Sequence, residues 1–219
     1  MNNTDYNVFC LGDSITYGLN DINGGWCDRL KNYFLDKEIK DPEGQSVRIW
    51  NFGISGQTIK NFTENSCLQE PLTRVKKHKS NIFIVAFGAN DSAYDINQSS
   101  FLTSVEDFTQ SLKKIFATYS KFGHIIFVNI TPVSVDINDK PDKYNCIRSN
   151  EYISTFNKII EEQAKERSSP YVDINTSLCN SLKSDKQNLL SYDGLHPNSS
   201  GHNLMYLEIK TAIESLLIS

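Results

Sequence analysis

A serine near the amino terminus and a histidine near the carboxyl terminus have the types and setting needed for acyl transfer. Ser14 lies in the string Gly12-Asp13-Ser14, and His196 ends the string Asp193-Gly194-Leu195-His196. A serine hydroxyl becomes a good nucleophile when an imidazole takes its proton and a carboxylate fixes the imidazole tautomer. Asp193 lies three residues before His196 in a turn-like segment, so its carboxylate can reach Nδ1 and leave Nε2 facing Ser14. The spacing therefore predicts a triad of Ser14, His196 and Asp193.

Acyl transfer also needs hydrogen-bond donors for the oxyanion of a tetrahedral intermediate. Two segments, 51–56 and 87–91, place glycine beside polar residues at the ends of predicted strands. Taken singly, these glycines also fit simple turns, Asn90 fits a capping residue, and an Asp-x-x-His string fits a plain polar loop. The two segments are therefore candidates for the donors.

Two hydrophobic patterns alternate along the chain and indicate the elements that position these residues. Short β-favouring runs occur at 8–11, 47–52, 82–87, 125–130 and 171–174, and several of them are apolar without alternation, which is typical of strands buried on both faces of a parallel sheet. Apolar residues recur at spacings of three and four in 101–119 and 152–164, and a last helix is expected from Ser199 to Leu217 with Asn198 or Ser199 as its N-cap. The alternation predicts a doubly wound, three-layer α/β/α domain.

The polar strings follow the predicted strands at their carboxyl ends, which is where such folds bind ligands. Gly12-Asp13-Ser14 follows the first strand, Gly53 the second and Gly88-Ala89-Asn90-Asp91 the third. The longest irregular stretch, 131–150, contains Pro132 and Pro141 and is expected to be a loop beside the site.

Length and composition favour one globular domain spanning residues 1–219. The 219 residues are 39% hydrophobic and carry a formal net charge of −4, which argues against nucleic acid as a partner. No apolar stretch is long enough for a signal sequence or a membrane span, so the chain as given is expected to be cytoplasmic. Five widely spaced cysteines without Cys-x-x-Cys indicate neither a disulfide framework nor a zinc site. The histidines lack a matching ligand set, and we expect neither a metal nor a cofactor.

An α/β-hydrolase is the nearest rival enzyme, because it has the same chain order of serine, aspartate and histidine. It requires a Gly-x-Ser-x-Gly elbow. The string Gly53-Ile54-Ser55-Gly56-Gln57 comes close, but Gln57 replaces the last glycine. Ser55 is therefore expected to line the pocket or form a turn.

A non-catalytic, flavodoxin-like module that binds a nucleotide or flavin is the alternative from a different class, since this architecture hosts many functions. No Gly-x-Gly-x-x-Gly or Walker-type loop follows a strand, which speaks against it.

Together and in this order, the strings resemble the blocks of the SGNH hydrolase superfamily, also called GDSL-type esterases and lipases. Ser14 matches the nucleophile block, Gly53 the glycine of the second block, Asn90 the asparagine of the third, and Asp193 with His196 the last block. The resemblance implies a flavodoxin-like sheet of five parallel strands in the order 2-1-3-4-5. It also implies ester hydrolysis without a cofactor.

In the scheme that the resemblance implies, Ser14 attacks the ester and His196 acts as base and then as acid, oriented by Asp193. The backbone N–H groups of Ser14 and Gly53 and the side-chain amide of Asn90 would hold the oxyanion. Asp13 and Asp91 would brace their loops by hydrogen bonds.

The small-molecule substrate is less well specified by the sequence. No long apolar lid is visible, so short-chain acyl esters or O-acetyl esters, including those of carbohydrates, are favoured over long-chain lipids. A lysophospholipase or thioesterase of the same family is the alternative. Trp26, Tyr94 and Tyr144 are candidates for pocket walls, with core packing the competing role for Trp26. The sequence makes no prediction of the oligomeric state.

Overall fold

Five parallel strands form the central sheet of the computed structural model, which describes residues 5–76, 79–183 and 188–217. They are β1 (Tyr6–Gly12), β2 (Val47–Gly53), β3 (Ser80–Ala86), β6 (His124–Val128) and β8 (Tyr171–Val172). Their order in the sheet is β2-β1-β3-β6-β8, and each neighbouring pair is parallel. The order 2-1-3-4-5 and the α/β class are thus confirmed. The first strand lies in the interior of the sheet, hydrogen-bonded on both sides.

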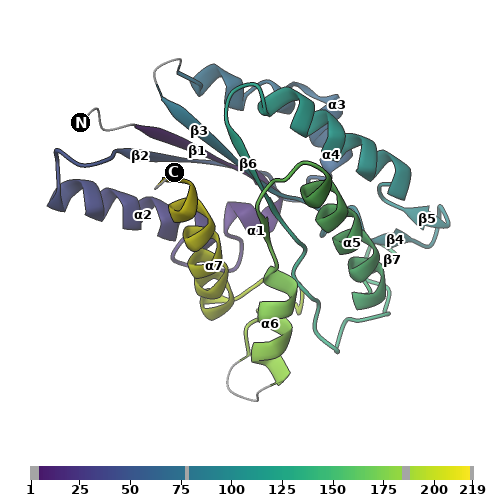
Figure 1. Cartoon of the computed structure of the whole chain (residues 1–219). Helices are drawn as coiled ribbons and strands as arrows, with labels where there is room; N and C mark the ends of the chain where they lie inside the picture. Colours follow the sequence, from purple (N-terminus) through teal and green to yellow (C-terminus); the bar gives the residue numbers. More distant parts are fainter. Residues whose placement is uncertain (1–4, 77–78, 184–187, 218–219) are drawn as a thin grey trace.

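Helices cover both faces of this sheet, as Figure 1 shows. On one face α2 (Gly25–Lys40), α6 (Ile174–Lys183) and α7 (Ser199–Leu217) pack through residues such as Trp26, Met205 and Ile209. On the other face α3 (Ile59–Glu64), α4 (Val105–Tyr119) and α5 (Asn150–Glu166) pack through residues such as Phe62, Phe108 and Phe156. Two apolar cores, one per face, therefore support the sheet, as the continuous apolar runs of its strands require.

The expected last helix is present, and its start shows why it begins there. Asn198 accepts hydrogen bonds from the backbone N–H groups of Ser200 and Gly201 through Oδ1, at 2.9 and 3.1 Å. These are otherwise unsatisfied donors of the first turn, so Asn198 is the N-cap. The remaining short helices are α1 (Ser14–Tyr17) and two 3₁₀ turns, η1 (Ser66–Leu68) and η2 (Pro71–Arg74).

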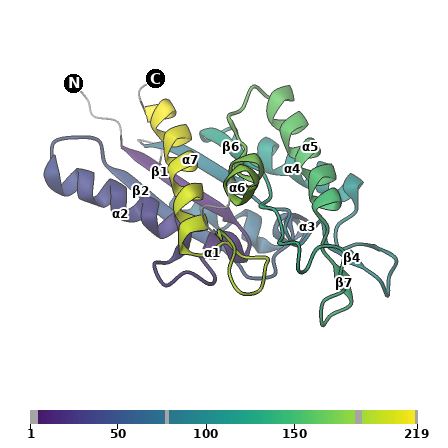
Figure 2. The same ribbon diagram turned by 90° about the horizontal axis from the view of Figure 1, so that it is seen from below.

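The structure differs from the sequence interpretation around a second, small sheet. It consists of β4 (Tyr94–Asp95), β5 (Ser100–Phe101) and β7 (Cys146–Ile147), paired antiparallel in the order β5-β4-β7. Figure 2 shows β4 and β7 at the end of the molecule away from α2. The helix expected from Phe101 starts at Val105, because the side chain of Ser104 caps it by accepting from Asp107 N–H at 3.1 Å. β7 lies inside the stretch 131–150, which was expected to be a loop.

Cys10, Cys27 and Cys146 are buried thiols. Within the described part of the chain, every helix is too short or too polar to cross a lipid bilayer.

Candidate active site

Ser14 is held at the carboxyl edge of the sheet by the turn that follows β1. That strand ends at Gly12, and α1 begins at Ser14. Asp13 caps α1, because its Oδ1 accepts a hydrogen bond from the N–H of Ile15 at 2.9 Å. A Cβ on Gly12 would collide with the side chain of Thr16, so only glycine allows α1 to fold back this closely. The hydroxyl of Ser14 is thus fixed within two residues of an interior strand.

A continuous hydrogen-bonded chain joins Ser14 to a carboxylate through His196. The distance from Ser14 Oγ to His196 Nε2 is 2.8 Å, and the distance from His196 Nδ1 to Asp193 Oδ2 is 2.7 Å. The structure therefore brings together the three residues of the predicted triad, in the predicted orientation of the imidazole. In this orientation Nδ1 carries the proton donated to Asp193, and Nε2 is the acceptor that faces the serine.

Donors from the same turn surround the carboxylate of Asp193. Its Oδ1 accepts from Ser191 Oγ at 2.8 Å and from the backbone N–H groups of Leu195 and His196, both at 3.0 Å. Partial burial raises the pKa of Asp193, but these donors and the imidazole lower it more, so the pKa lies well below its ordinary value. Asp193 is therefore ionised at neutral pH.

The turn that carries Asp193 and His196 is fastened to the start of α7 and to a neighbouring loop. Ser191 N–H donates to the carbonyl of His196 at 2.8 Å, which closes the turn. Gly194 adopts a φ of +67°, which favours glycine, and its carbonyl accepts from Ser134 N–H at 2.8 Å. Asn198, the cap of α7, donates through Nδ2 to the carbonyl of Leu190 at 3.1 Å.

Asn90 and Gly56 lie beside Ser14 in the wall of one pocket. Asn90 Nδ2 donates one hydrogen to the carbonyl of Gln57 at 3.1 Å, which orients the amide. Gly56 occupies the third position of a turn closed by Gln57 N–H and the carbonyl of Ile54 at 3.1 Å, and its φ of +77° explains the glycine. A second amide hydrogen of Asn90 remains for a ligand, because the side-chain amide has two.

Gly53 does not line this pocket with Ser14, Gly56 and Asn90, so its predicted position beside the nucleophile is corrected here. Its N–H donates to the side chain of Asn51 at 2.8 Å, and Asn51 Nδ2 donates in turn to the carbonyl of Thr16 at 3.0 Å. A Cβ on Gly53 would collide with the backbone nitrogen of Tyr17. Gly53 is thus a point of close contact between β2 and α1, and it lines a different hollow together with Tyr17. The signal that could have separated the two glycines is the turn in Ile54-Ser55-Gly56-Gln57.

Two buried aspartates lie directly behind the site. The carboxylate of Asp91 accepts from Ile59 N–H at 2.9 and 3.2 Å, and Asp13 caps α1, so both brace their loops as expected. Burial raises the pKa of each to about 7, and the charge of Asp13 contributes to the shift of Asp91.

The pocket in front of Ser14 has a volume of about 870 Å³. Of the three aromatic candidates, Tyr144 lines it. Trp26 is fully buried in the core, and Tyr94 packs against Phe101 and Tyr152 in a cluster beside the pocket. Sequence reasoning missed Tyr192, which also lines the pocket and is 94% exposed, although its place next to Asp193 was a usable signal. Ser55 lines the pocket as well.

Loop 136–148 supplies another wall of this pocket. Asp142 organises it, because its carboxylate accepts from the N–H groups of Tyr144 and Cys146 at 2.8 and 3.0 Å and from Arg148 Nη1 at 2.5 Å. The ammonium of Lys143 lies 4.9 Å from the ring centre of Tyr144. This wall is charged and mostly exposed, and it presents Tyr144 to the pocket.

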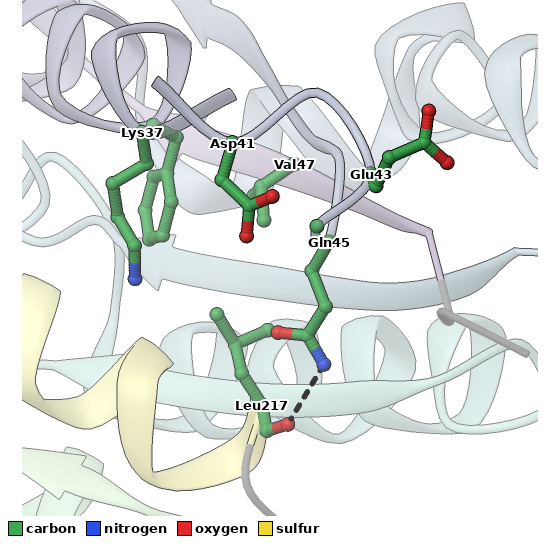
Figure 3. A pocket seen from close by; sticks show the side chains of 8 residues that line it. Lys37, Asp41, Glu43, Gln45, Val47 and Leu217 are labelled. Carbon is green, nitrogen blue, oxygen red and sulfur yellow. Dashed lines mark hydrogen bonds between the residues drawn. The ribbon is translucent and has the colours of Figure 1, made fainter. Parts of the chain in front are cut away.

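A further hollow lies at the other edge of the sheet, where β2 begins, and Figure 3 shows its lining of Lys37, Asp41, Gln45 and Leu217. Gln45 donates there to the carbonyl of Leu217 at 3.3 Å. Its charged residues face solvent, and it lacks a nucleophile with an adjacent base. Among the residues described, no group of three or more His, Cys, Asp or Glu side chains is arranged to hold a metal ion.

Comparison with known proteins defines the class. The model of the GDSL-like lipase/acylhydrolase family matches residues 8–209. The chain therefore belongs to this family, within the SGNH hydrolase superfamily.

Individual proteins that are similar to this chain share less than a third of its residues. The chain is 27% identical over 227 residues to a multidomain esterase of Ruminococcus flavefaciens, covering 90% of this chain and 27% of the relative. It thus spans about a quarter of the length of that curated relative. Among solved structures, a variant of Axe2, an acetyl xylan esterase from Geobacillus stearothermophilus, matches with a TM-score of 0.71 and 18% identity, covering 97% of both chains. The lipase/acylhydrolase from Enterococcus faecalis matches with a TM-score of 0.72 and 20% identity, covering 96% of both chains.

Proposed function

We propose that this protein hydrolyses carboxylic esters of small, water-soluble alcohols, foremost O-acetyl esters of carbohydrates, through an acyl-enzyme on Ser14. The observation that carries the proposal is the chain of contacts from Ser14 Oγ to His196 Nε2 and from Nδ1 to Asp193, at 2.8 and 2.7 Å, opening into a pocket. A serine hydrolase requires this hydrogen-bonded arrangement of serine, histidine and aspartate, whereas a protein without catalytic activity does not.

In the proposed reaction, Ser14 Oγ attacks the ester carbonyl and its proton passes to His196 Nε2. The tetrahedral intermediate collapses, the bond to the alcohol oxygen breaks, and His196 returns the proton to that oxygen. Water then attacks the acyl-enzyme with His196 as base, releasing the acid and restoring Ser14. Asp193 remains ionised throughout and stabilises the imidazolium.

For the oxyanion, we propose Ser14 N–H, Gly56 N–H and the Asn90 amide as donors, with Gly56 in place of Gly53. Gly56 and Asn90 line the pocket with Ser14, and Asn90 is already oriented by its bond to Gln57. Gly53 N–H is occupied by Asn51. Donors fixed before the substrate arrives give the largest stabilisation of developing charge.

The carbohydrate substrate is proposed from the pocket walls. Tyr144 and Tyr192 are 69% and 94% exposed and both line the pocket, so each offers a ring face to a sugar. The other lining groups include Lys140, Asp142 and Arg148, which suit hydroxyl groups better than long acyl chains. The acetyl xylan esterase among the similar structures is in keeping with this choice.

The decisive experiment is hydrolysis of p-nitrophenyl esters from acetyl to dodecanoyl by wild type and Ser14→Ala. We expect activity highest on the acetyl ester and abolished by the substitution. A steep rise in kcat/KM toward the dodecanoyl ester would favour a lysophospholipase or thioesterase instead. Equal activity of Ser14→Ala and wild type would contradict the serine mechanism, and a thermal shift with flavin or nucleotide but no hydrolysis would favour the binding module.

A second experiment tests the carbohydrate. Release of acetate from acetylated xylo-oligosaccharides should have a higher KM in Tyr144→Ala than in wild type, because the ring face is lost. Tyr144→Phe keeps the ring and should behave as wild type. A KM unchanged in both variants, and in Tyr192→Ala, would remove the aromatic platform from the proposal.

A further inference from the structure

We infer that Asn20 is a positioning residue for the reaction, because it fixes the Asp193 carboxylate relative to the nucleophile. Asn20 Nδ2 donates to Asp193 Oδ2 at 2.7 Å and to Ser191 Oγ at 3.0 Å. The inference rests on the proposed roles of Ser14, His196 and Asp193 and adds a fourth residue to them. Nothing in the sequence strings singled out Asn20.

The oxygen that Asn20 contacts is the one that accepts the hydrogen bond of the imidazole. Asp193 Oδ2 accepts both from Asn20 Nδ2 and from His196 Nδ1, each at 2.7 Å. The three other described donors, from Ser191, Leu195 and His196 N–H, all reach Oδ1. Asn20 is therefore the described donor that sets the direction of Oδ2, in addition to the imidazole itself.

The donors to Oδ1 belong to the same turn as Asp193, so they move with it. Asn20 belongs to the segment that follows the nucleophile, 173 positions away in the sequence. The N–H groups of Gly18 and Leu19 both donate to the carbonyl of Ser14, at 3.1 and 3.0 Å, which ties Asn20 to Ser14. Three contacts thus join the two segments: Ser14 to His196, Asn20 to Asp193 and Asn20 to Ser191. Contacts at separate points restrict the relative orientation of two segments, which one contact alone does not.

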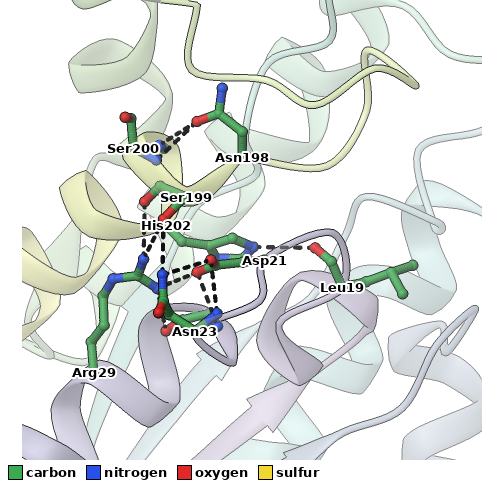
Figure 4. A network of polar contacts seen from close by, with 10 residues as sticks. Leu19, Asp21, Asn23, Arg29, Asn198, Ser199, Ser200 and His202 are labelled. Atoms are coloured by element: carbon green, nitrogen blue, oxygen red, sulfur yellow. Dashed lines mark hydrogen bonds and ion pairs between the residues drawn. The ribbon is translucent and has the colours of Figure 1, made fainter.

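The loop that carries Asn20 is itself anchored from behind, as Figure 4 shows. The carboxylate of Asp21 is buried, forms an ion pair with Arg29 and accepts from Gly25 N–H at 3.2 Å. Arg29 also donates to Ser199 Oγ at 2.9 Å, at the start of α7. The carbonyl of Leu19 accepts from His202 Nε2 at 3.4 Å. Asn20 is consequently attached to α2 and α7, the helices that support the sheet.

Two local features suit this anchoring. Asn20 has a φ of 66°, in the left-handed region that asparagine tolerates better than most residues. Burial lowers the pKa of His202 to about 4, so its imidazole is neutral at working pH and can keep one ring nitrogen as the donor to Leu19.

The test compares Asn20→Gly with wild type, since glycine keeps the left-handed backbone and removes only the amide. We expect kcat for p-nitrophenyl acetate to fall about 10- to 100-fold, the range for losing one hydrogen bond to a charged group, with KM and Tm nearly unchanged. Ser168→Gly is the matched control, because Ser168 is exposed, has a φ of 50° and follows α5. It should retain full activity. Wild-type kcat in Asn20→Gly would overturn the inference.

Asn20→Asp is a second test of the inference, which can be used if the glycine variant does not fold. It keeps size and backbone preference but, above the titration range of carboxylates, places an acceptor where the donor was. Its loss of kcat at such pH should be at least as large as that of Asn20→Gly. Full activity there would also overturn the inference.

A double-mutant cycle separates positioning through Asp193 from a general structural role. In an Asp193→Ala background, Asn20→Gly should change kcat less than about twofold, because the group it acts through is gone. An equal fold-loss in both backgrounds would contradict the inference. Ser14→Ala is measured alongside: if it is active the proposed function fails, whereas inactive Ser14→Ala with fully active Asn20→Gly contradicts only the role of Asn20.

Discussion

The wall of the pocket that carries Ser14 and His196 is buried and joined to the sheet, whereas the wall formed by loop 136–148 is exposed and charged. The first wall draws its hydrogen bonds from segments far apart in the sequence, as between Ser14 and His196. The second combines bonds from Asp142 to its own neighbours, over at most six positions, with the pairing of its two-residue strand β7 to β4. One wall is therefore part of the central sheet and its turns, and the other is held by local contacts and one short strand pairing outside that sheet.

This difference separates two tasks of a hydrolase. Reacting atoms must be held to within fractions of an ångström, which requires the rigid wall. Selectivity for the alcohol part of the ester depends on contacts more distant from the reacting atoms. A surface loop can provide such contacts and can vary in sequence. Substitutions in the first wall should therefore change kcat on any ester, and substitutions in the second should change KM for particular esters.

The largest effect is expected for His196→Ala. Removing the base should lower kcat about 10⁵- to 10⁶-fold on every ester. His124→Ala, at the exposed start of β6, is the control and should leave kcat unchanged. Wild-type kcat in His196→Ala would argue against a histidine base.

Next in size is Asn90→Ala, which removes one proposed oxyanion donor. We expect kcat to fall about 10²- to 10³-fold, with little change in KM, because the donor acts on charge formed in the transition state. Asn65→Ala, at the exposed end of α3, should have wild-type kcat. Wild-type kcat in Asn90→Ala would show that the oxyanion is held elsewhere.

Asp142→Ala tests the second wall. Loss of the bonds to Tyr144 N–H and Cys146 N–H should displace Tyr144 and raise KM for acetylated xylo-oligosaccharides by about tenfold or less. The kcat for p-nitrophenyl acetate should remain within about twofold of wild type. A large loss of kcat on both substrates would mean that the two walls are not independent.

The smallest effect concerns stability and the buried Asp91. An unfolded aspartate titrates near pH 3.9, whereas burial raises the folded pKa of Asp91 to about 7. Between these values the folded state binds the extra proton, so this group makes stability fall as pH rises through that window. Asp91→Asn keeps an acceptor for Ile59 N–H, and its Tm should decline less over that range. Asp36→Asn, at an exposed position, should follow wild type.

The fold could be predicted because its signals are local. The interior strands β1, β3 and β6 are apolar runs, the edge strand β2 still carries β-favouring residues, and α7 begins at a capping residue, Asn198, visible in the sequence. The contact between Asp193 and His196 could be predicted because the two residues are neighbours in one turn. The small sheet could not, since β4, β5 and β7 are each two residues long and are defined by pairing between distant segments.

Gly53 and Asn20 show that, within the site too, contacts between distant segments cannot be predicted from the sequence. The sequence presents two glycines, Gly53 and Gly56, in one segment, and only the approach of α1 to Gly53 shows which of them faces away from the pocket. Asn20 lies in a polar loop without a motif. Its contact with Asp193 depends on how two segments 173 positions apart are brought together.

The place of Ser14 directly after β1 also sets how the protein loses activity on heating. Amide hydrogens of β1, bonded to strands on both sides, should exchange with solvent only when the whole domain unfolds. Loop 136–148 lies outside the central sheet and is joined to β4 only by a strand of two residues, so it should open locally below that transition. On heating, the selectivity among esters of different alcohols should therefore decrease first. The hydrolysis itself should be lost only when the central sheet unfolds.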